Sequence, residues 1–320
     1  MAKISKIALE EHFMTPGFEH YSRSFTSLMP ETVARQLATD LSDFDEARLS
    51  AMDRAGIELS VLSQTGPAIQ GESDRAKAIE MAILSNDYLA EKVARRPDRY
   101  AGFAALPMQS PRDAVVELHR AITVLGMKGA LVNGHSQGAY YDDPAYDVVW
   151  SAFEQLDVPL YLHPTDAKGG SLAFSGHPEL NGAIWGWGVE TGTHALRLLF
   201  GGVFDRFPRL KVILGHMGEG LPFQRWRIDS RFAAYPNGIH LDRAPSEYIG
   251  SNIVITTAGV CSHAALGGAL TELGADAVMF SVDYPYESSE IAGQFIEEAP
   301  LDSETLQKVC SGNAKRLLKL

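Results

Sequence analysis

The stretch KIALEEHF, residues 6–13, joins a short apolar run to three ionisable side chains. Glu10, Glu11 and His12 follow the apolar residues without a turn residue between them. Because alternate side chains of a strand share a face, Glu10 and His12 are expected to point the same way. Taken alone, the stretch also fits a strand that runs into a solvated loop. The alternative is that the strand ends in two metal-ligating groups on one face. The rest of the sequence is needed to distinguish these two interpretations.

The composition narrows the class of protein. The chain has 320 residues, 45% of them hydrophobic, with a net charge of −12 and a pI near 5.3. This acidity makes nucleic acid an unsuitable partner. Only Cys261 and Cys310 are present, which argues against a disulfide scaffold or a thiolate metal site. No secretory signal and no apolar run long enough for a membrane span are visible, so a cytoplasmic protein is expected.

Eight short apolar runs alternate with helical patterns along the chain, as strands buried on both faces would. The runs lie at 6–9, 59–63, 100–106, 128–133, 158–162, 210–215, 252–257 and 277–281. Helical patterns are clearest at 74–97, at 110–126 and in the C-terminal stretch 303–320. Ser110 is expected to be the N-cap of the second of these, with Pro111 in its first turn.

This alternation predicts an α/β fold, specifically a single (β/α)8 TIM barrel domain over residues 1–320. A doubly wound open sheet alternates in the same way. However, no GxGxxG follows the first strand and no GK[ST] occurs in the chain. In a barrel, active sites lie at the C-terminal ends of the strands. The long loops 13–30 and 164–187 leave two of these ends.

Reactive side chains collect just after the predicted strands: Glu10 and His12 after the first, His163 after the fifth and Asp283 after the eighth. The first and eighth strands are neighbours in a closed barrel, so these groups can meet. Two imidazoles and two carboxylates suit one divalent ion such as Zn²⁺, Mn²⁺ or Mg²⁺. For His163 alone, a hydrogen-bonded core histidine is an equal alternative. The whole set favours metal, since charged groups are rarely buried unless paired or metal-bound.

The sixth predicted strand runs into LGHMGEG, which places His216 and Glu219 in one turn. His216 is either a further metal ligand or, oriented by Glu219, an acid/base group. A helix-terminal turn with a glutamate favoured by the helix dipole is the structural alternative. The nearness of the two residues favours the acid/base interpretation.

Several stretches, taken together, resemble the amidohydrolase superfamily from end to end of the chain. They are KIALEEHF, GALVNG, LDVPLYLHP, LGHMGEGLPFQRWRID and FSVDYPYE. The resemblance is narrower to its metal-dependent decarboxylase branch, which includes gamma-resorcylate (2,6-dihydroxybenzoate), 2,3-dihydroxybenzoate and 5-carboxyvanillate decarboxylases. The first strand carries ExH where hydrolytic members carry HxH, and Asn133 stands where two-metal members have a lysine. Both departures favour a single metal ion.

The resemblance implies an amidohydrolase-type barrel, one divalent metal ion and a homodimer or homotetramer. By motif, the metal ligands would be Glu10, His12, His163 and Asp283. The catalytic residues would be Asp283, His216 and Glu219. The substrate-binding residues would be Arg227, Asn133 and Phe25.

The implied activity is that of a carbon–carbon lyase. The expected reaction is reversible, non-oxidative removal of CO₂ from a small aromatic carboxylate such as 2,6- or 2,3-dihydroxybenzoate. Asp283 is the expected proton donor, with His216 managing the charge on the hydroxyl. One alternative is metal-dependent hydrolysis of a lactone or amide, because the same ligands could activate water. Another is a barrel that binds metal and aromatics without catalysis. Tyr284 stands where the decarboxylase branch usually has tryptophan. The resemblance therefore does not fix which substituents the substrate ring carries.

Overall fold

The computed structural model describes residues 4–320 except 23–25 and 28, and it has a strand in each of the eight predicted runs. The strands are β1 Lys6–Phe13, β2 Ile57–Gln64, β3 Tyr100–Gly102, β4 Ala130–Asn133, β5 Leu160–His163, β6 Val212–Leu214, β7 Ile253–Thr256 and β8 Val278–Met279. β1 extends four residues beyond the predicted run, so the ionisable residues are part of the strand. β3 is shorter than expected.

The strands are parallel and follow one another in chain order around a barrel. β1, β2 and β3 form one sheet, and β4 to β8 form a second. Single bridges join the two sheets at both seams, between Ala104 and Ala130 and between Glu11 and Tyr284. The second bridge brings the end of β1 beside the segment that follows β8, as the barrel prediction required.

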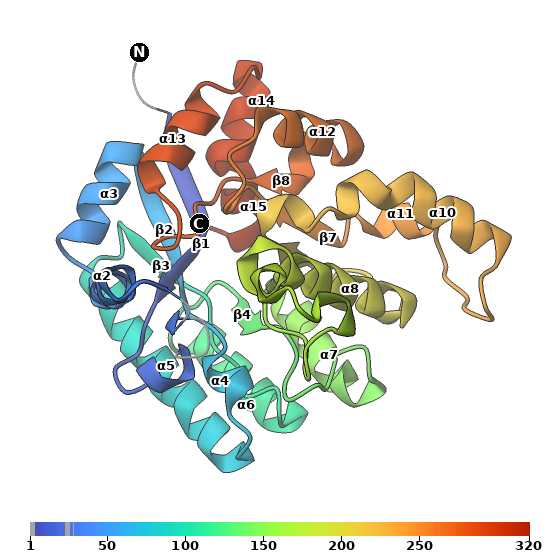
Figure 1. The fold of residues 1–320 in the computed structure, drawn as a ribbon, viewed down its shortest axis with the longest axis horizontal. Helices are drawn as coiled ribbons and strands as arrows, with labels where there is room; N and C mark the ends of the chain where they lie inside the picture. The colour runs from blue at the N-terminus through green and yellow to red at the C-terminus, as the bar shows by residue number, and fades with distance from the viewer. Residues whose placement is uncertain (1–3, 23–25, 28) are drawn as a thin grey trace.

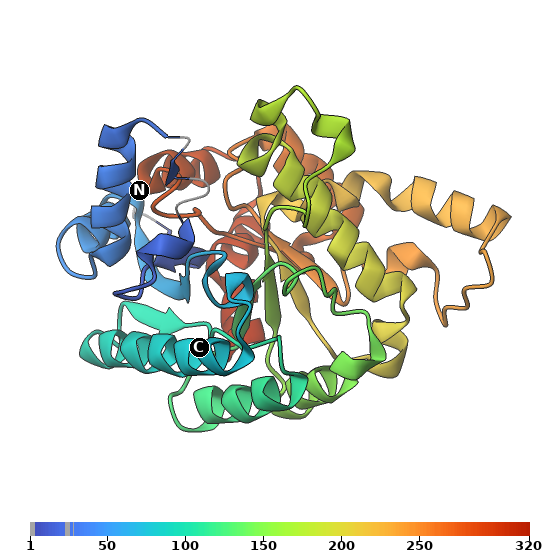
Figure 2. The same cartoon turned by 60° about the horizontal axis from the view of Figure 1, so that its bottom comes forward.

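Helices surround the strands, as Figure 1 shows. They are α2 Glu31–Ser42, α3 Ala47–Ala55, α4 Ala68–Gly71, α5 Arg75–Arg95, α6 Pro111–Thr123, α7 Asp147–Leu156, α8 Gly186–Phe200, α9 Val203–Arg206, α10 Arg225–Ala234, α11 Pro245–Tyr248, α12 His263–Leu273, α13 Ser289–Glu297, α14 Ser303–Gln307 and α15 Asn313–Leu318. In both ribbon views α10 and α11 project from the side of the molecule (Figures 1 and 2). Within the described residues, no helix is both long enough and apolar enough to span a membrane.

Two helical predictions differ in detail from the structure. Ser110 occupies the N-cap position of α6, but its hydroxyl donates to the Asp113 carboxylate instead of accepting a helix N–H. The C-terminal helix is interrupted by a π-helical turn at Lys308–Gly312. There the carbonyl of Val309 accepts a hydrogen bond from Phe280 N at 2.9 Å, so a tertiary contact competes with the regular helical ladder.

A local irregularity of β1 decides which side chains reach the barrel interior. Ile7 and Leu9 pack in the inner apolar cluster with Tyr161, whereas Phe13 packs in the outer cluster beneath the helices. The register of β1 against β2 shifts between Ala8 and Glu11. Such a bulge re-aims the side chains that follow it.

Candidate metal and catalytic site

Four predicted metal ligands meet at the C-terminal mouth of the barrel. Glu10 and His12 come from β1, His163 ends β5, and Asp283 follows β8. One potential ligand atom from each residue lies within 4.8 Å of the others. Glu10, His12 and His163 are buried, and Asp283 is partly exposed. Strand ends that are far apart in the sequence thus supply two imidazoles and two carboxylates to one point.

The atoms facing this point lack other partners. Glu10 Oε1 lies 3.4 Å from His163 Nε2, and Asp283 Oδ1 lies 3.2 Å from His12 Nε2. Glu10 Oε1, His12 Nε2 and Asp283 Oδ1 are buried atoms for which no hydrogen bond is found. Leaving buried polar atoms unpaired is costly. One divalent cation would satisfy all of them, so the residues present fit the metal that the sequence predicted.

Neighbouring groups fix the orientation of these side chains. His163 Nδ1 lies 3.1 Å from the Pro164 carbonyl, and His12 Nδ1 lies 3.3 Å from Ser63 Oγ. Glu10 Oε2 accepts a hydrogen bond from the Tyr161 hydroxyl. These contacts leave the Nε2 atoms and Glu10 Oε1 directed at the centre. Contacts of this kind hold ligand rings in place and tune metal affinity.

The electrostatics of the cluster favour a bound cation. Burial raises the pKa of Glu10 to about 7 and lowers the pKa of His163 well below its ordinary value. Burial would also raise the pKa of Asp283, but the neighbouring imidazoles of His12 and His216 hold it below its usual range. A metal site needs ionised carboxylates and neutral imidazoles. A divalent cation would offset the cost of ionising Glu10 in this buried setting.

His216 and Glu219 lie beside the cluster, as expected. His216 Nδ1 is 2.8 Å from Glu219 Oε1, and its Nε2 is 3.6 Å from Asp283 Oδ2. Burial alone would lower the pKa of His216, but the carboxylates of Glu10, Glu219 and Asp283 raise it well above its ordinary value. His216, Met217 and Glu219 all have positive φ angles. Strained backbone of this kind clusters at functional sites.

Of the three predicted substrate-binding residues, the structure describes two, which lie on different elements. Asn133 ends β4 and donates from Nδ2 to the Gln64 carbonyl at 3.4 Å, while its buried Oδ1 accepts no hydrogen bond from the described residues. Arg227 is exposed on α10, and no ion pair joins it to any described residue. Phe25 lies outside the described residues.

Glu11 has a structural role that the sequence pattern did not predict. Its carboxylate accepts hydrogen bonds from Ser281 Oγ at 3.1 Å and Val282 N at 3.0 Å. Burial raises its pKa to about 8. The buried Arg48 completes this support, because its Nη2 donates to the His12 carbonyl at 2.7 Å. Glu11 therefore ties β1 to the segment that carries Asp283. The alternation of side chains along a strand is the signal that could have found this role, because it places Glu11 on the face opposite Glu10 and His12.

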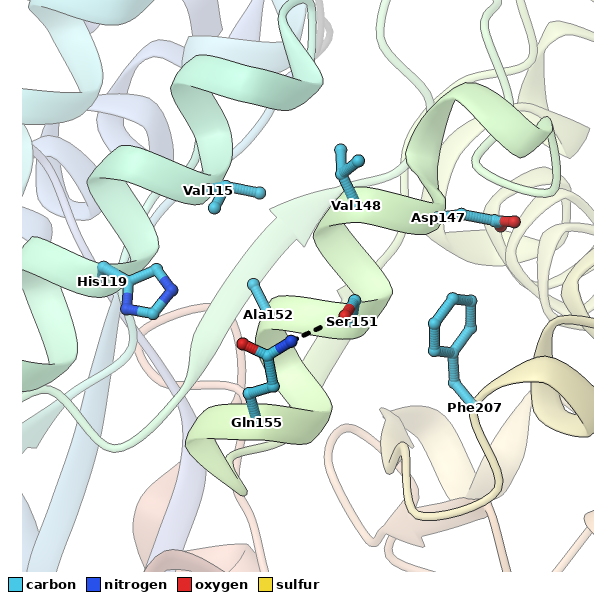
Figure 3. A pocket seen from close by; sticks show the side chains of 8 residues that line it. All are labelled: Val115, His119, Asp147, Val148, Ser151, Ala152, Gln155 and Phe207. Atoms are coloured by element: carbon cyan, nitrogen blue, oxygen red, sulfur yellow. Dashed lines mark hydrogen bonds between the residues drawn. The ribbon is translucent and has the colours of Figure 1, made fainter.

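A groove of about 460 Å³ lies on the outer surface, at α6 and α7 (Figure 3). Its lining residues are Val115, His119, Asp147, Val148, Ser151, Ala152, Gln155 and Phe207. None of them belongs to the predicted site. The candidate site is identified by the four ionisable side chains that converge at the barrel mouth. The outer groove is lined by no such cluster of imidazoles and carboxylates.

The sequence of the chain is similar to those of known proteins. Residues 14–320 match the amidohydrolase family profile. The chain is 44% identical over 324 residues to the gamma-resorcylate decarboxylase of Rhizobium radiobacter, covering 98% of each chain.

Two solved structures are similar over nearly their whole length. A 2,6-dihydroxybenzoate decarboxylase complexed with 2,6-dihydroxybenzoate is 43% identical with a TM-score of 0.95, and the match covers 99% of this chain and 100% of that one. A dihydroxybenzoic acid decarboxylase from Polaromonas sp. JS666, with bound manganese and the inhibitor 2-nitroresorcinol, is 41% identical with a TM-score of 0.94. That match covers 99% of this chain and 97% of the other.

Proposed function

Because this chain belongs to the amidohydrolase family, we propose that it is a metal-dependent, non-oxidative decarboxylase of a hydroxybenzoate such as 2,6- or 2,3-dihydroxybenzoate. It is then a carboxy-lyase, and the reaction is reversible. The observation that carries the proposal is the buried cluster of two imidazoles and two carboxylates at the barrel mouth. The likeness to decarboxylases over nearly the whole chain supports this chemistry for the cluster.

The proposed ligands of one divalent ion are Glu10, His12, His163 and Asp283. Zn²⁺, Mn²⁺ and Mg²⁺ all accept this donor set. Manganese is favoured because the similar Polaromonas enzyme holds it. Held by these four residues, such an ion would supply positive charge that offsets the negative charge of the substrate.

The remaining chemistry belongs to the protein. An aryl carboxylate loses CO₂ poorly because the ring does not readily hold a carbanion, so protonation of the ring carbon comes first. Asp283 is the proposed donor of this proton. His216 Nε2 lies 3.6 Å from Asp283 Oδ2 and is the proposed acid/base group that stabilises charge on the substrate hydroxyl. Glu219 holds the His216 ring in place through Nδ1. The ring carbon thus gains one proton, the bond from it to the carboxylate carbon then breaks to release one CO₂, and the electron pair of that bond restores the aromatic ring.

Substrate binding is assigned to Asn133, Arg227 and Phe25. Asn133 Oδ1 is a buried acceptor that receives no hydrogen bond from the described residues. Arg227 has no carboxylate partner among the described residues, which leaves its guanidinium available for an anionic group. Fixing the ring by such contacts would hold it near the proton donor.

Three further features belong to the proposal. The chain is taken as one domain, since a bridge joins its first strand to the segment that follows its last strand. It forms a homodimer or homotetramer, because Trp226 on α10 is 79% exposed and Phe223 just before it is 51% exposed. Aromatic residues are typical of interfaces. A cytoplasmic location fits the two cysteines, which are both free.

The test compares two reactions in one preparation. Manganese-loaded protein is incubated with 2,6-, 2,3- and 2,4-dihydroxybenzoate and salicylate while CO₂ is measured, and with a lactone panel while hydrolysis is measured. CO₂ release from any hydroxybenzoate supports the proposal. Lactone hydrolysis without CO₂ release would replace it with the hydrolase alternative.

A further inference from the structure

A pair of hydroxyl groups lies next to the metal cluster and is not used by the mechanism above. Tyr286 follows the ligand Asp283 by three residues, and its ring meets the ring of His12 edge-on with centroids 5.5 Å apart. Its hydroxyl is hydrogen-bonded to Thr65 Oγ1, just after β2. The pair thus spans from the segment after β8 to the end of β2 and passes beside a proposed ligand.

Both members of this pair are held in place. Tyr286 N donates to the Asp283 carbonyl at 2.9 Å, so the turn that carries the proposed proton donor also positions the tyrosine. Its ring packs against the apolar cluster that includes Met14 and Phe18, beyond the end of β1. Thr65 is buried, and its N–H donates to the Phe13 carbonyl at 2.9 Å. A site this constrained can discriminate between ligands, since little reorganisation is available to it.

The chemistry of the pair suits a hydroxyl-bearing ring. If the carboxylate of a substrate were held at the proposed metal site, the rest of its ring would face the side chains around that site. A hydroxyl buried there without a partner is penalised, whereas a wall built from hydroxyl groups can donate and accept.

We propose that Tyr286 and Thr65 form the specificity-determining wall of the site and select hydroxybenzoates that carry a second ring hydroxyl. This inference rests on the proposed function and deepens it, because it names dihydroxybenzoates over monohydroxybenzoates as the preferred substrate class. Sites built to hydrogen-bond a ligand hydroxyl reject analogues that lack it.

A matched pair of unreactive ligands separates selection from catalysis. 2-Nitroresorcinol, the inhibitor held by the similar Polaromonas enzyme, differs from 2-nitrophenol by one hydroxyl. Their dissociation constants are measured by calorimetry on manganese-loaded protein. The original protein should bind 2-nitroresorcinol more tightly. Tyr286→Phe and Thr65→Val should each reduce this preference about 3- to 10-fold, the size of one neutral hydrogen bond.

Tyr284→Phe is the matched control. Tyr284 lies in the same turn, but its ring packs under the Arg48 guanidinium, 4.7 Å from ring centroid to Cζ. Its loss should leave the preference unchanged. Equal affinities of the original protein for the two ligands, or preferences unchanged in both Tyr286→Phe and Thr65→Val, would overturn the inference. Failure of the proposed function would show differently, as absence of CO₂ release from every hydroxybenzoate.

Discussion

The Glu10 carboxylate packs against the backbone of Gly215, and a methyl group added there would test the geometry of the metal site. A Cβ atom on Gly215 would lie 2.3 Å from Glu10 Oε2 and 3.0 Å from Glu10 Cδ. Gly215 has φ −72° and ψ −167°, an extended conformation that alanine adopts without strain. The effect of Gly215→Ala is therefore steric and acts on the carboxylate.

The size of the effect follows from these distances. Carbon and oxygen atoms make ordinary contacts at about 3.3 Å or more, so the carboxylate has to withdraw by about 1 Å. Metal sites keep their ligand distances within about 0.2 Å. The shift also disturbs the hydrogen bond between Tyr161 and Glu10. Losing such support typically lowers metal affinity about 10- to 100-fold, or about 1.4 to 2.8 kcal/mol.

The assay is calorimetric titration of metal-free protein with Mn²⁺, with thermal unfolding as a check on folding. Gly267→Ala is the matched control, because a Cβ atom there meets no atom within 4 Å. Gly267 lies in α12, where alanine is tolerated. Gly215→Ala should weaken Mn²⁺ binding while the control binds as the original protein does. Unchanged affinity in correctly folded Gly215→Ala would refute the assignment of Glu10 as a ligand.

Four further outcomes are expected. Asp283→Asn should lower CO₂ release at least about 100-fold while 2-nitroresorcinol still binds, and full activity would remove Asp283 as proton donor. Arg48→Met should lower the free energy of unfolding in urea by about 3 kcal/mol or more, because buried carbonyls lose their donor; an unchanged midpoint would contradict this. Lys77 and Tyr21 hold the pKa of Glu72 near 2, below its ordinary 4.5, so its stabilisation is complete above pH 4.5 and lost toward pH 2. The stability difference between Glu72→Gln and the original protein should shrink over that interval, and a constant difference would exclude this linkage. Trp226→Ser should shift light-scattering mass toward the monomer, whereas an unchanged mass would exclude α10 from the interface.

The fold could be predicted from the sequence because buried parallel strands are continuous apolar runs separated by helical patterns. All eight runs contain strands, and single bridges close the seams, from β1 to Tyr284 in the segment after β8 and from Ala104, just after β3, to β4. Strand ends were less predictable. The ladder of β1 reaches Phe13 because Glu11 pairs with Tyr284 and His12 N donates to the Tyr284 carbonyl, contacts that depend on the closed barrel.

Residues of the candidate site could be predicted where they end strands. The side chains that support them from other parts of the fold could not. Strand position identified His163 and Asp283, because C-terminal strand ends of a barrel converge. The contact from Tyr161 to Glu10 depends on a bulge in β1 that apolar periodicity does not reveal. Likewise, the pairing of Tyr286 with Thr65 needs the three-dimensional position of two loops.

The most direct test of the account is a single measurement of CO₂ release from 2,6-dihydroxybenzoate before chelation, after chelation and after Mn²⁺ is restored. The metal content of each sample is determined alongside. We expect about one metal ion per chain, loss of CO₂ release when the metal is removed, and recovery when Mn²⁺ is returned. CO₂ release that persists in fully metal-free protein would contradict the assignment of the cluster formed by Glu10, His12, His163 and Asp283 as the catalytic metal site.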